Sequence, residues 1–175
     1  MSVPEVKVLV LRFFLQGLLG RNLYTETRRG RPTSLFIRHV DGGSNVFVEQ
    51  ELLSLTTPTY DLEQYGIRFV ASPRHADVLL LTGPLTWNMQ GPALEAFRAM
   101  PHPRCIVTVG DCADYRAAAL PPTCPFAASY AVAPLPEEMR RAIAHHVPGL
   151  SPSPLEILRA LQELRTICSA THGMV

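Results

Sequence analysis

The sequence lacks a surplus of charge of either sign. Its 175 residues carry 16 Lys and Arg against 15 Asp and Glu, which gives a formal net charge of +1. Dedicated nucleic-acid binders carry a basic surface. This balance, with no RNA- or DNA-binding motif in view, argues against nucleic acid as a partner. With 47% hydrophobic and 18% charged residues, the chain is expected to be globular, with one core and a surface partly covered by partners.

Cysteines are few, and none is paired with another at a metal-binding spacing. The four are Cys105, Cys112, Cys124 and Cys168. No Cys-x-x-Cys pair occurs, and no histidine spacing completes a zinc site. Because the four fall in separate predicted elements, we expect reduced thiols in a cytosolic setting that do not converge on one site.

The sequence also lacks a hydrophobic run of the ~20 residues that a membrane-spanning helix needs. A cleavable signal peptide is not expected, because a basic n-region and a small-residue cleavage site are missing. Residues 6–19 are nevertheless very apolar and predict an N-terminal helix, followed by a basic connector. The favoured interpretation is a helix that docks on a membrane subunit or lies at the lipid interface. The alternative is a helix that packs on its own domain.

What the sequence does contain is a strand–turn–helix pattern at residues 34–51. Residues 35–40 predict a buried strand, Asp41-Gly42-Gly43-Ser44 predicts a tight turn, and a helix is expected to begin after it. Free backbone N–H groups and the helix dipole converge at such a point, which is where α/β proteins hold cofactors. The pattern therefore predicts the position of a functional site.

The rest of the chain predicts a three-layer, flavodoxin-like α/β domain with a mainly parallel sheet, preceded by the apolar N-terminal helix. The expected segments are residues 1–33 for that helix and its connector, 34–167 for the α/β domain, and 168–175 for a tail. Further strands are expected at 67–70, 78–81 and 105–109, with a short one at 129–132. Helices are expected at 46–56, 88–100, 137–146 and 155–168.

Several runs are distinctive when taken in order along the chain. They are the turn after the first strand, Tyr60-Asp61-Leu62-Glu63, Ala71-Ser72-Pro73-Arg74-His75-Ala76-Asp77, Gly110-Asp111-Cys112-Ala113 and Val147-Pro148-Gly149-Leu150. Together they resemble the 20 kDa-type small subunit that complex I shares with the membrane-bound [NiFe] hydrogenases, in its hydrogenase branch. The resemblance covers residues 34–164. It implies a large-subunit partner like the complex I 49 kDa or hydrogenase large subunit, a membrane arm, and a peripheral location on the cytoplasmic face of the cell membrane.

The departures from this family concern its iron–sulfur centre. Members hold a [4Fe–4S] cluster with four thiolates, and the matching positions here are Asn45, Val48, Cys112 and Leu150. We call these four positions the cradle. Valine and leucine have no lone pair for iron, and asparagine is a poor ligand beside thiolate. The sequence thus predicts a degenerate member with no cluster and no other metal, in which Val48, Leu150 and Phe47, where the family has glycine, fill the vacated space.

Other candidate residues have two interpretations each. His39 is expected to be a satisfied core histidine rather than a ligand, and His145-His146 is expected to complement the dipole at a helix C-terminus. Glu49 and Glu51, beside the cradle, are either partner-facing or proton-relay carboxylates, or ordinary acids of a first helical turn.

Arg74-His75 is expected either at an interface with a redox subunit or in a plain surface turn, and Trp87 either at an interface or in a half-buried packing role. No Ser/His/Asp triad, paired carboxylate or P-loop is visible, so no catalytic residue is assigned. The leading hypothesis is a structural and coupling subunit that carries no electrons. The alternatives are an electron-transferring subunit of an NADH–quinone oxidoreductase or hydrogenase-type complex, and a free-standing α/β protein that binds a small molecule.

Overall fold

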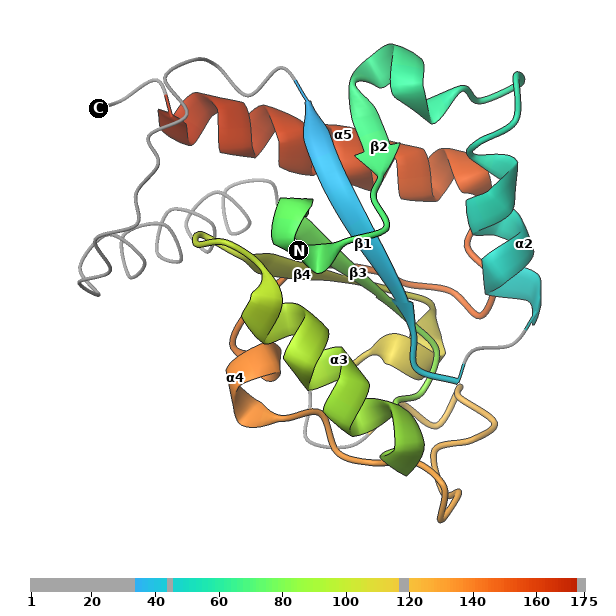
Figure 1. Ribbon diagram of the computed structural model, residues 1–175. Coiled ribbons are helices and arrows are strands. Elements are labelled where there is room, and N and C mark those ends of the chain that lie inside the picture. The colour runs from blue at the N-terminus through green and yellow to red at the C-terminus, as the bar shows by residue number, and fades with distance from the viewer. Residues whose placement is uncertain (1–33, 44–45, 117–119, 173–175) are drawn as a thin grey trace.

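The computed structural model describes residues 34–43, 46–116 and 120–172 of the chain (Figure 1). The apolar N-terminal helix and basic connector expected from the sequence lie outside these residues, as does Asn45. Within them, no helix combines the length and apolar character that crossing a membrane needs.

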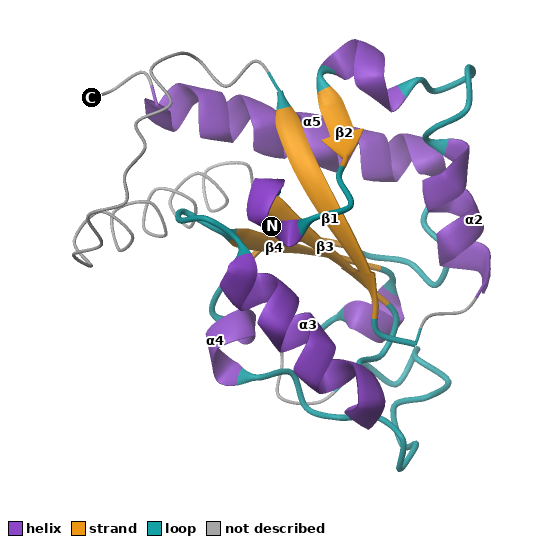
Figure 2. Cartoon of the chain, viewed as in Figure 1, coloured by secondary structure: helices purple, strands orange, loops and turns teal. Residues whose placement is uncertain are grey.

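Strands and helices alternate through the described residues (Figure 2). The strands are β1 (Leu35–Asp41), β2 (Ile67–Phe69), β3 (Val78–Thr82), β4 (Cys105–Val109) and β5 (Ile143–Val147). The helices are α2 (Val46–Ser54), α3 (Trp87–Ala99), α4 (Glu137–Arg140) and α5 (Pro154–His172). Three short 3₁₀ turns, η1 (Leu62–Tyr65), η2 (Pro73–His75) and η3 (Asp111–Ala113), lie between them.

The five strands form one sheet in the order β2-β1-β3-β4-β5, and each neighbouring pair is parallel. This is the strand order of a doubly wound α/β fold, in which the chain direction across the sheet reverses between the first and third strands. The predicted α/β fold is confirmed, and the sheet is fully parallel where only a mainly parallel one was expected.

Helices cover both faces of the sheet, which makes three layers (Figure 1). Val48 and Leu52 of α2 pack with Ile157 and Leu161 of α5 on one face, and α3 and α4 pack on the other. In β3, Leu80 joins the first core whereas Leu79 and Leu81 join the second, because successive side chains of a strand point to opposite faces. All five residues of β3 are buried, as a central strand requires.

The sequence-based prediction is wrong near residue 143. A helix was expected over 137–146, but α4 ends at Arg140 and residues 143–147 form β5, paired with β4. His145 and His146 therefore lie on a strand and not at a helix C-terminus. Ile143 and Val147 suit a strand locally, and pairing with β4 decides the outcome. The strand expected at 129–132 is reduced to one bridge between Thr86 and Val132.

Replacing a buried leucine with alanine should destabilise the fold much more than replacing an exposed one. Leu80 is fully buried in β3, whereas Leu53 on α2 is 68% exposed. We expect Leu80→Ala to lower the free energy of unfolding by about 2–5 kcal/mol, since it leaves a cavity, and Leu53→Ala to change it by less than about 0.5 kcal/mol. Denaturant unfolding of the full chain measures both. Equal effects would contradict the described core.

Candidate functional site

The candidate site lies where the four longer strands end, at the carboxyl edge of the sheet. The turns after these strands are tied together by backbone hydrogen bonds. Gly42 donates to the Thr82 carbonyl at 3.0 Å, and Thr86 donates back to Gly42 at 2.9 Å. Gly110 donates to the Val147 carbonyl at 2.9 Å. Ligands in open α/β sheets bind at this edge, beside the point where strand order reverses.

The Asp-Gly-Gly turn after β1 requires its glycines. A Cβ atom on Gly42 would lie 3.0 Å from Leu85 Cα, and one on Gly43 would lie 2.8 Å from Thr86 Cγ2. Gly43 also has φ of 135°, which side chains rarely adopt. Asp41 Oδ1 accepts a 2.8 Å hydrogen bond from Gly43 N and closes the turn. Because the turn after β3 approaches this closely, positions 42 and 43 require glycine.

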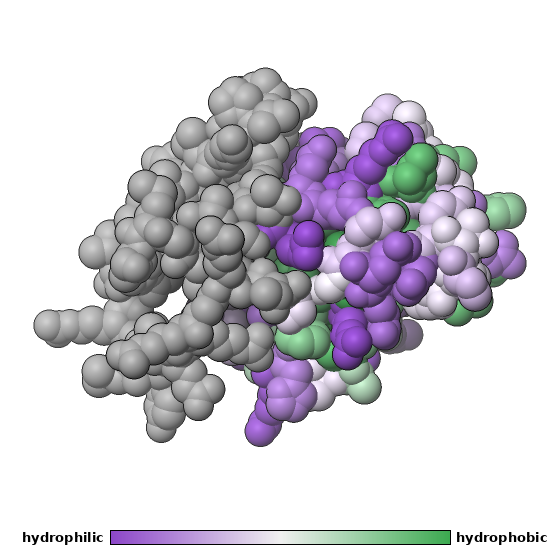
Figure 3. Space-filling view, turned by 90° about the horizontal axis from the view of Figure 1, so that it is seen from above, coloured by the Kyte–Doolittle hydropathy of each residue, from purple (hydrophilic) through white to green (hydrophobic). Residues whose placement is uncertain are grey.

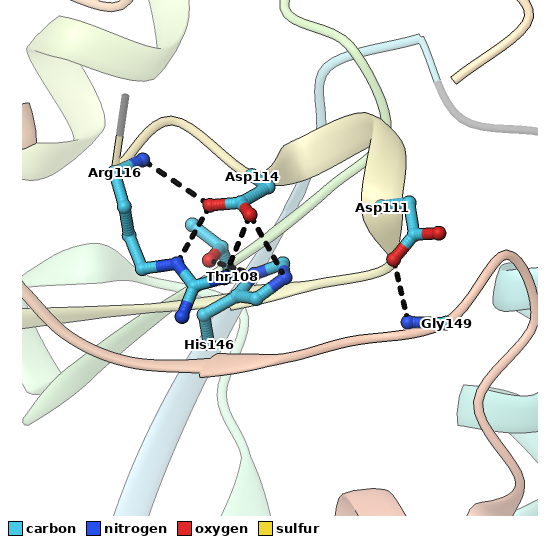
Figure 4. A network of polar contacts seen from close by, with 6 residues as sticks. All are labelled: Thr108, Asp111, Asp114, Arg116, His146 and Gly149. Carbon is cyan, nitrogen blue, oxygen red and sulfur yellow. Dashed lines mark hydrogen bonds and ion pairs between the residues drawn. The ribbon is translucent and has the colours of Figure 1, made fainter. Parts of the chain in front are cut away.

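Three of the four cradle positions come together around Gly110. A Cβ atom on Gly110 would lie 3.5 Å from Val48 Cγ2 and 3.7 Å from the Gly149 carbonyl. Asp111 ties the turns after β4 and β5, since its Oδ1 accepts a 2.7 Å hydrogen bond from Gly149 N (Figure 4). Its own N–H donates to the Gly149 carbonyl at 2.9 Å. Val48, Cys112 and Leu150 thus belong to segments that meet at one place.

Of the three apolar side chains that were expected to fill this place, one is buried. Val48 is 3% exposed and belongs to the core under α2 and α5. Phe47 and Leu150 are 64% and 49% exposed, so they do not fill an internal space within this chain. Their apolar surface faces outward at the carboxyl edge instead.

Cys112 has Cys124 near it, a neighbour that the sequence did not predict. Cys112 is 8% exposed, and Cys124, which is 2% exposed, lies beside it. Burial, followed by the hydrogen bond and charge of the Cys124 thiol, raises the pKa of Cys112 to about 12. The sequence did not predict that Cys124 lies near Cys112, because the proline-rich segment between them has no regular hydrophobic period. Cys105 lies at the start of β4, at the opposite end of that strand from Cys112.

The donor atoms present do not fit a [4Fe–4S] cluster. Such a cluster takes four thiolates, whereas Val48 and Leu150 offer no donor atom, which leaves Cys112 as the one thiol among these positions. In the ranges that the structure describes, no group of three or more His, Cys, Asp or Glu side chains could hold a metal ion. Val48 Cγ2 would contact a Cβ placed on Gly110, so a buried methyl group stands close to the turn that carries Cys112.

A polar cluster joins β1, β3 and α2 beside the cradle. The Thr82 hydroxyl donates to Glu49 Oε1 at 2.7 Å and lies 3.0 Å from His39 Nε2. Because a hydroxyl has one hydrogen, Thr82 must accept from His39, which places a proton on Nε2. His39 Nε2 also lies 3.4 Å from Glu49 Oε2. His39 is thus hydrogen-bonded on β1, but its side chain is 27% exposed and does not lie in the core that was expected. Thr82 is the partner that sequence reasoning missed.

The remaining candidates lie at or near the surface. Arg74 and His75 are exposed in η2, and Glu51 is half-buried. Trp87 is 57% exposed at the start of α3, and its indole N–H donates to the Tyr130 carbonyl at 3.2 Å. Trp87 is therefore held in place while most of its ring remains available to solvent or to a partner.

A second polar network lies under the turn that carries Cys112 (Figure 4). His146, with its side chain 1% exposed, has Nδ1 2.8 Å from the Thr108 hydroxyl and Nε2 3.7 Å from Asp114 Oδ2. Burial lowers the pKa of His146 to about 4, although the Asp114 carboxylate opposes this. Hydrogen bonds from Arg116 lower the pKa of Asp114. His146 is therefore neutral at pH 7.

This network predicts a specific acid instability. The pKa of His146 is lower in the folded chain than in the unfolded one, so its contribution is complete above pH 6.5 and is lost as pH falls toward 4. We expect wild type to lose up to about 3 kcal/mol of unfolding free energy over that window. The Asp114 contribution is lost only at lower pH, below its usual pKa of 3.8.

His146→Gln keeps a hydrogen-bonding group for Thr108 but does not titrate, so its unfolding free energy should depend less on pH between 6.5 and 4. His75→Gln, at an exposed position, is the matched control and should retain the wild-type slope. Denaturant unfolding at a series of pH values measures all three chains. An unchanged slope in His146→Gln would show that the buried imidazole is not the titrating group.

Comparison with curated proteins finds relatives in two kinds of complex. The chain is 40% identical over 81 residues to formate hydrogenlyase subunit 7 of Escherichia coli (strain K12), covering 46% of this chain and 32% of that protein. It is 37% identical over 79 residues to a probable membrane-bound hydrogenase subunit of Pyrococcus furiosus, covering 45% and 47%. It is 31% identical over 116 residues to an NADH-quinone oxidoreductase subunit of Heliobacterium modesticaldum, covering 66% and 62%.

The chain thus spans less than two thirds of the length of each of these relatives. Among solved structures, it is similar to a chain of the membrane-bound sulfane sulfur reductase, described as an archaeal respiratory membrane complex. The TM-score is 0.61 at 21% sequence identity, over 80% of this chain and 73% of that one. At this identity the similarity supports the fold alone.

The model of a protein family covers more of the chain than the two hydrogenase-type relatives do. The match runs over residues 48–164, from the buried valine of the cradle to the last buried leucine of α5. It includes most of α2, the turns after β3, β4 and β5, and the first half of α5. The chain therefore belongs to the family of the 20 kDa subunit of NADH–ubiquinone oxidoreductase.

Proposed function

We propose that this chain is a structural and coupling subunit of a complex I-like or membrane-bound hydrogenase-type assembly, and that it has no iron–sulfur cluster and carries no electrons itself. It bridges a large subunit of the catalytic type and a membrane arm, peripheral to the cytoplasmic face of the membrane. The observation that carries this proposal is the cradle, where Val48 is buried in the core and Cys112 is the one thiol among the family's four ligand positions.

The donor set is the first step of the argument. An electron carrier needs a redox centre, and the family's centre needs four thiolates that together supply the negative charge and the coordination geometry around iron. A single thiol among the four positions meets neither need. Val48 in place of a ligand instead extends the core that α2 and α5 build on the sheet.

The exposed apolar residues are the second step. Val46, Phe47 and Leu150 are 66%, 64% and 49% exposed, and they follow the ends of β1 and β5. On the described part of the face in Figure 3, hydrophobic areas are small and separated by hydrophilic residues. Apolar side chains that gather beside a site are typical of a surface that a partner covers. We define Val46, Phe47 and Leu150 as the docking edge and assign it to the large subunit.

The proposal predicts a chain without bound iron. After anaerobic reconstitution of the full chain with ferrous iron and sulfide, we expect less than stoichiometric iron by elemental analysis. The paramagnetic signal of a reduced [4Fe–4S] cluster should be absent. Four iron atoms per chain with that signal would overturn the proposal and return the chain to the electron-transferring subunits.

A gain-of-ligand variant is the matched comparison. Asn45→Cys, Val48→Cys and Leu150→Cys together restore four cysteines at the cradle, with Cys112 as the fourth. This variant should bind iron where wild type does not. Adding Cys112→Ser to it should lower the iron content again, which distinguishes a cluster in the cradle from iron bound loosely by added thiols.

Charge placed on the docking edge should weaken assembly. We expect Phe47→Asp to reduce the yield of large subunit that copurifies with the tagged chain by at least about tenfold, because a buried aromatic anchor at an interface contributes about 2 kcal/mol or more. Leu53→Asp, on the last turn of the same helix and 68% exposed, should retain the partner. Equal loss in both variants would place the interface elsewhere on α2.

A further inference from the structure

Three aromatic side chains are exposed at and beside the start of α3, and the function proposed above uses none of them. Tyr130 is 96% exposed, Trp87 is 57% exposed and Phe126 is 43% exposed. Tyr130 and Phe126 belong to residues 120–136, which precede α4 and which we call the aromatic loop. This loop projects beside the first turn of α3 (Figure 1). Large aromatic side chains that gather on a surface mark a place where a partner binds.

Hydrogen bonds hold the aromatic loop against the start of α3. Trp87 N donates to the Ala131 carbonyl at 3.2 Å, and the Trp87 indole N–H donates to the Tyr130 carbonyl at 3.2 Å. Ala133 N donates to the Leu85 carbonyl at 2.7 Å. The three rings are therefore presented by a loop that is fixed to the fold.

The two segments that carry these rings contain no charged residue. Residues 117–136 have no Asp, Glu, Lys or Arg, and neither do residues 78–94, which include Trp87. Moving a charged side chain from water into an apolar medium is costly, and neither segment would incur that cost. The charge pattern therefore complements an uncharged, apolar partner and offers nothing for an acidic or basic one to pair with.

Polar groups in and beside the aromatic loop bind to the chain itself. Ser129 N donates to the Phe126 carbonyl at 2.9 Å, and Ser129 Oγ accepts from Ala131 N at 3.3 Å. Gln90 Nε2 donates to the Pro134 carbonyl at 2.7 Å. A protein interface carries about one hydrogen bond per 100–200 Å², and these groups are already engaged. A bilayer surface has no such requirement, and backbone groups that are already paired approach it at lower cost.

We propose that the aromatic loop and Trp87 form a membrane-contact surface, in which the three rings enter the headgroup level of a lipid bilayer. Trp and Tyr concentrate at this level because each combines an apolar ring with a polar group. An irregular loop does not enter the hydrocarbon core when it faces lipid. In the part of the chain that the structure describes, no helix is long and apolar enough to cross that core. The contact therefore lies on the membrane and does not span it.

This inference deepens the peripheral location in the proposed function and rests on it, but it does not rest on the missing cluster. The surface adjoins the turn after β1, since Thr86 N donates to the Gly42 carbonyl at 2.9 Å and Trp87 follows directly. The docking edge begins at Val46, shortly after the same turn. A large subunit on the docking edge and a bilayer on the aromatic loop would thus bind neighbouring parts of the carboxyl edge.

Fluorescence of the full chain tests the proposal, because Trp87 is the one tryptophan in the sequence. The chain is mixed with vesicles of phosphatidylcholine, which carry no net charge, so that attraction of arginines to anionic lipid does not contribute. We expect the Trp87 emission to shift to shorter wavelength. We also expect it to be quenched when the lipid is brominated on its acyl chains. Sedimentation of the vesicles measures separately whether the chain is bound.

Variants of the exposed rings identify the surface. Tyr130→Asp and Phe126→Asp should each lower the vesicle partition coefficient, measured through Trp87 emission, by at least about tenfold, because a carboxylate resists entry into the bilayer. Both positions are exposed, so the fold should be retained. Tyr130→Phe should keep the wild-type quenching. Leu53→Asp, at a position 68% exposed on α2, is the matched control and should keep it as well.

Three outcomes would overturn the inference. The chain could fail to bind the vesicles, or it could sediment with them while Trp87 is not quenched, which would assign the lipid contact to another segment. Tyr130→Asp and Phe126→Asp could lower the yield of copurified large subunit and leave the quenching unchanged, which would assign the loop to a protein contact. The iron content of the chain is independent of all three. Stoichiometric iron would overturn the proposed function and leave a quenched Trp87 as evidence for the membrane contact.

Discussion

The mutual hydrogen bonding of the turns at the carboxyl edge is the constraint on which the rest of this structure depends. Asp111 holds the turn after β5 through its carboxylate and its N–H. Gly42 exchanges backbone hydrogen bonds with the segment after β3. These contacts use protein groups alone. In many small metalloproteins the opposite holds, and metal binding supplies the folding free energy.

Hydrogen bonds between protein groups would allow the family scaffold to persist under the proposed loss of its cluster. Val48 contributes to the core beneath the turns, and Cys112 stays buried beside a second thiol. A side chain that only filled space would be expected to be buried in the isolated chain. Phe47 and Leu150 are exposed instead. The simplest physical reason to keep them apolar is a partner surface, and this favours a chain retained for assembly.

The sequence predicted the fold well where the local pattern and the tertiary pairing agree. The continuous apolar run of β3 fits a strand that is buried on both faces. The glycine-rich sequence after β1 fits a tight turn. The prediction failed at β5, because Ile-Ala-His-His-Val follows an acidic helix start and looks like its continuation. Only the unpaired edge of β4 decides that it is a strand. The position of Cys124 near Cys112 could not be predicted either. The loop sequence before Cys124 has no hydrophobic periodicity, so tertiary packing alone decides where the loop runs.

The turn after β1 was predicted from the sequence but the side chains that meet beside it were not, and the reason is the same. The carboxyl ends of parallel strands meet at one edge of a sheet, so Asp41, Thr82 and Cys112 lie at that edge. Which side chain meets which depends on twist and register, such as the pairing of His39 with Leu80 and of Asp41 with Thr82. That register brings the Thr82 hydroxyl between His39 and Glu49. Glu49 is therefore held by a strand residue as well as by its helix, which ties α2 and its docking edge to the centre of the sheet. In the proposed coupling role, motion of a docked partner would reach β1 and β3 through these short polar contacts instead of being absorbed by a free helix.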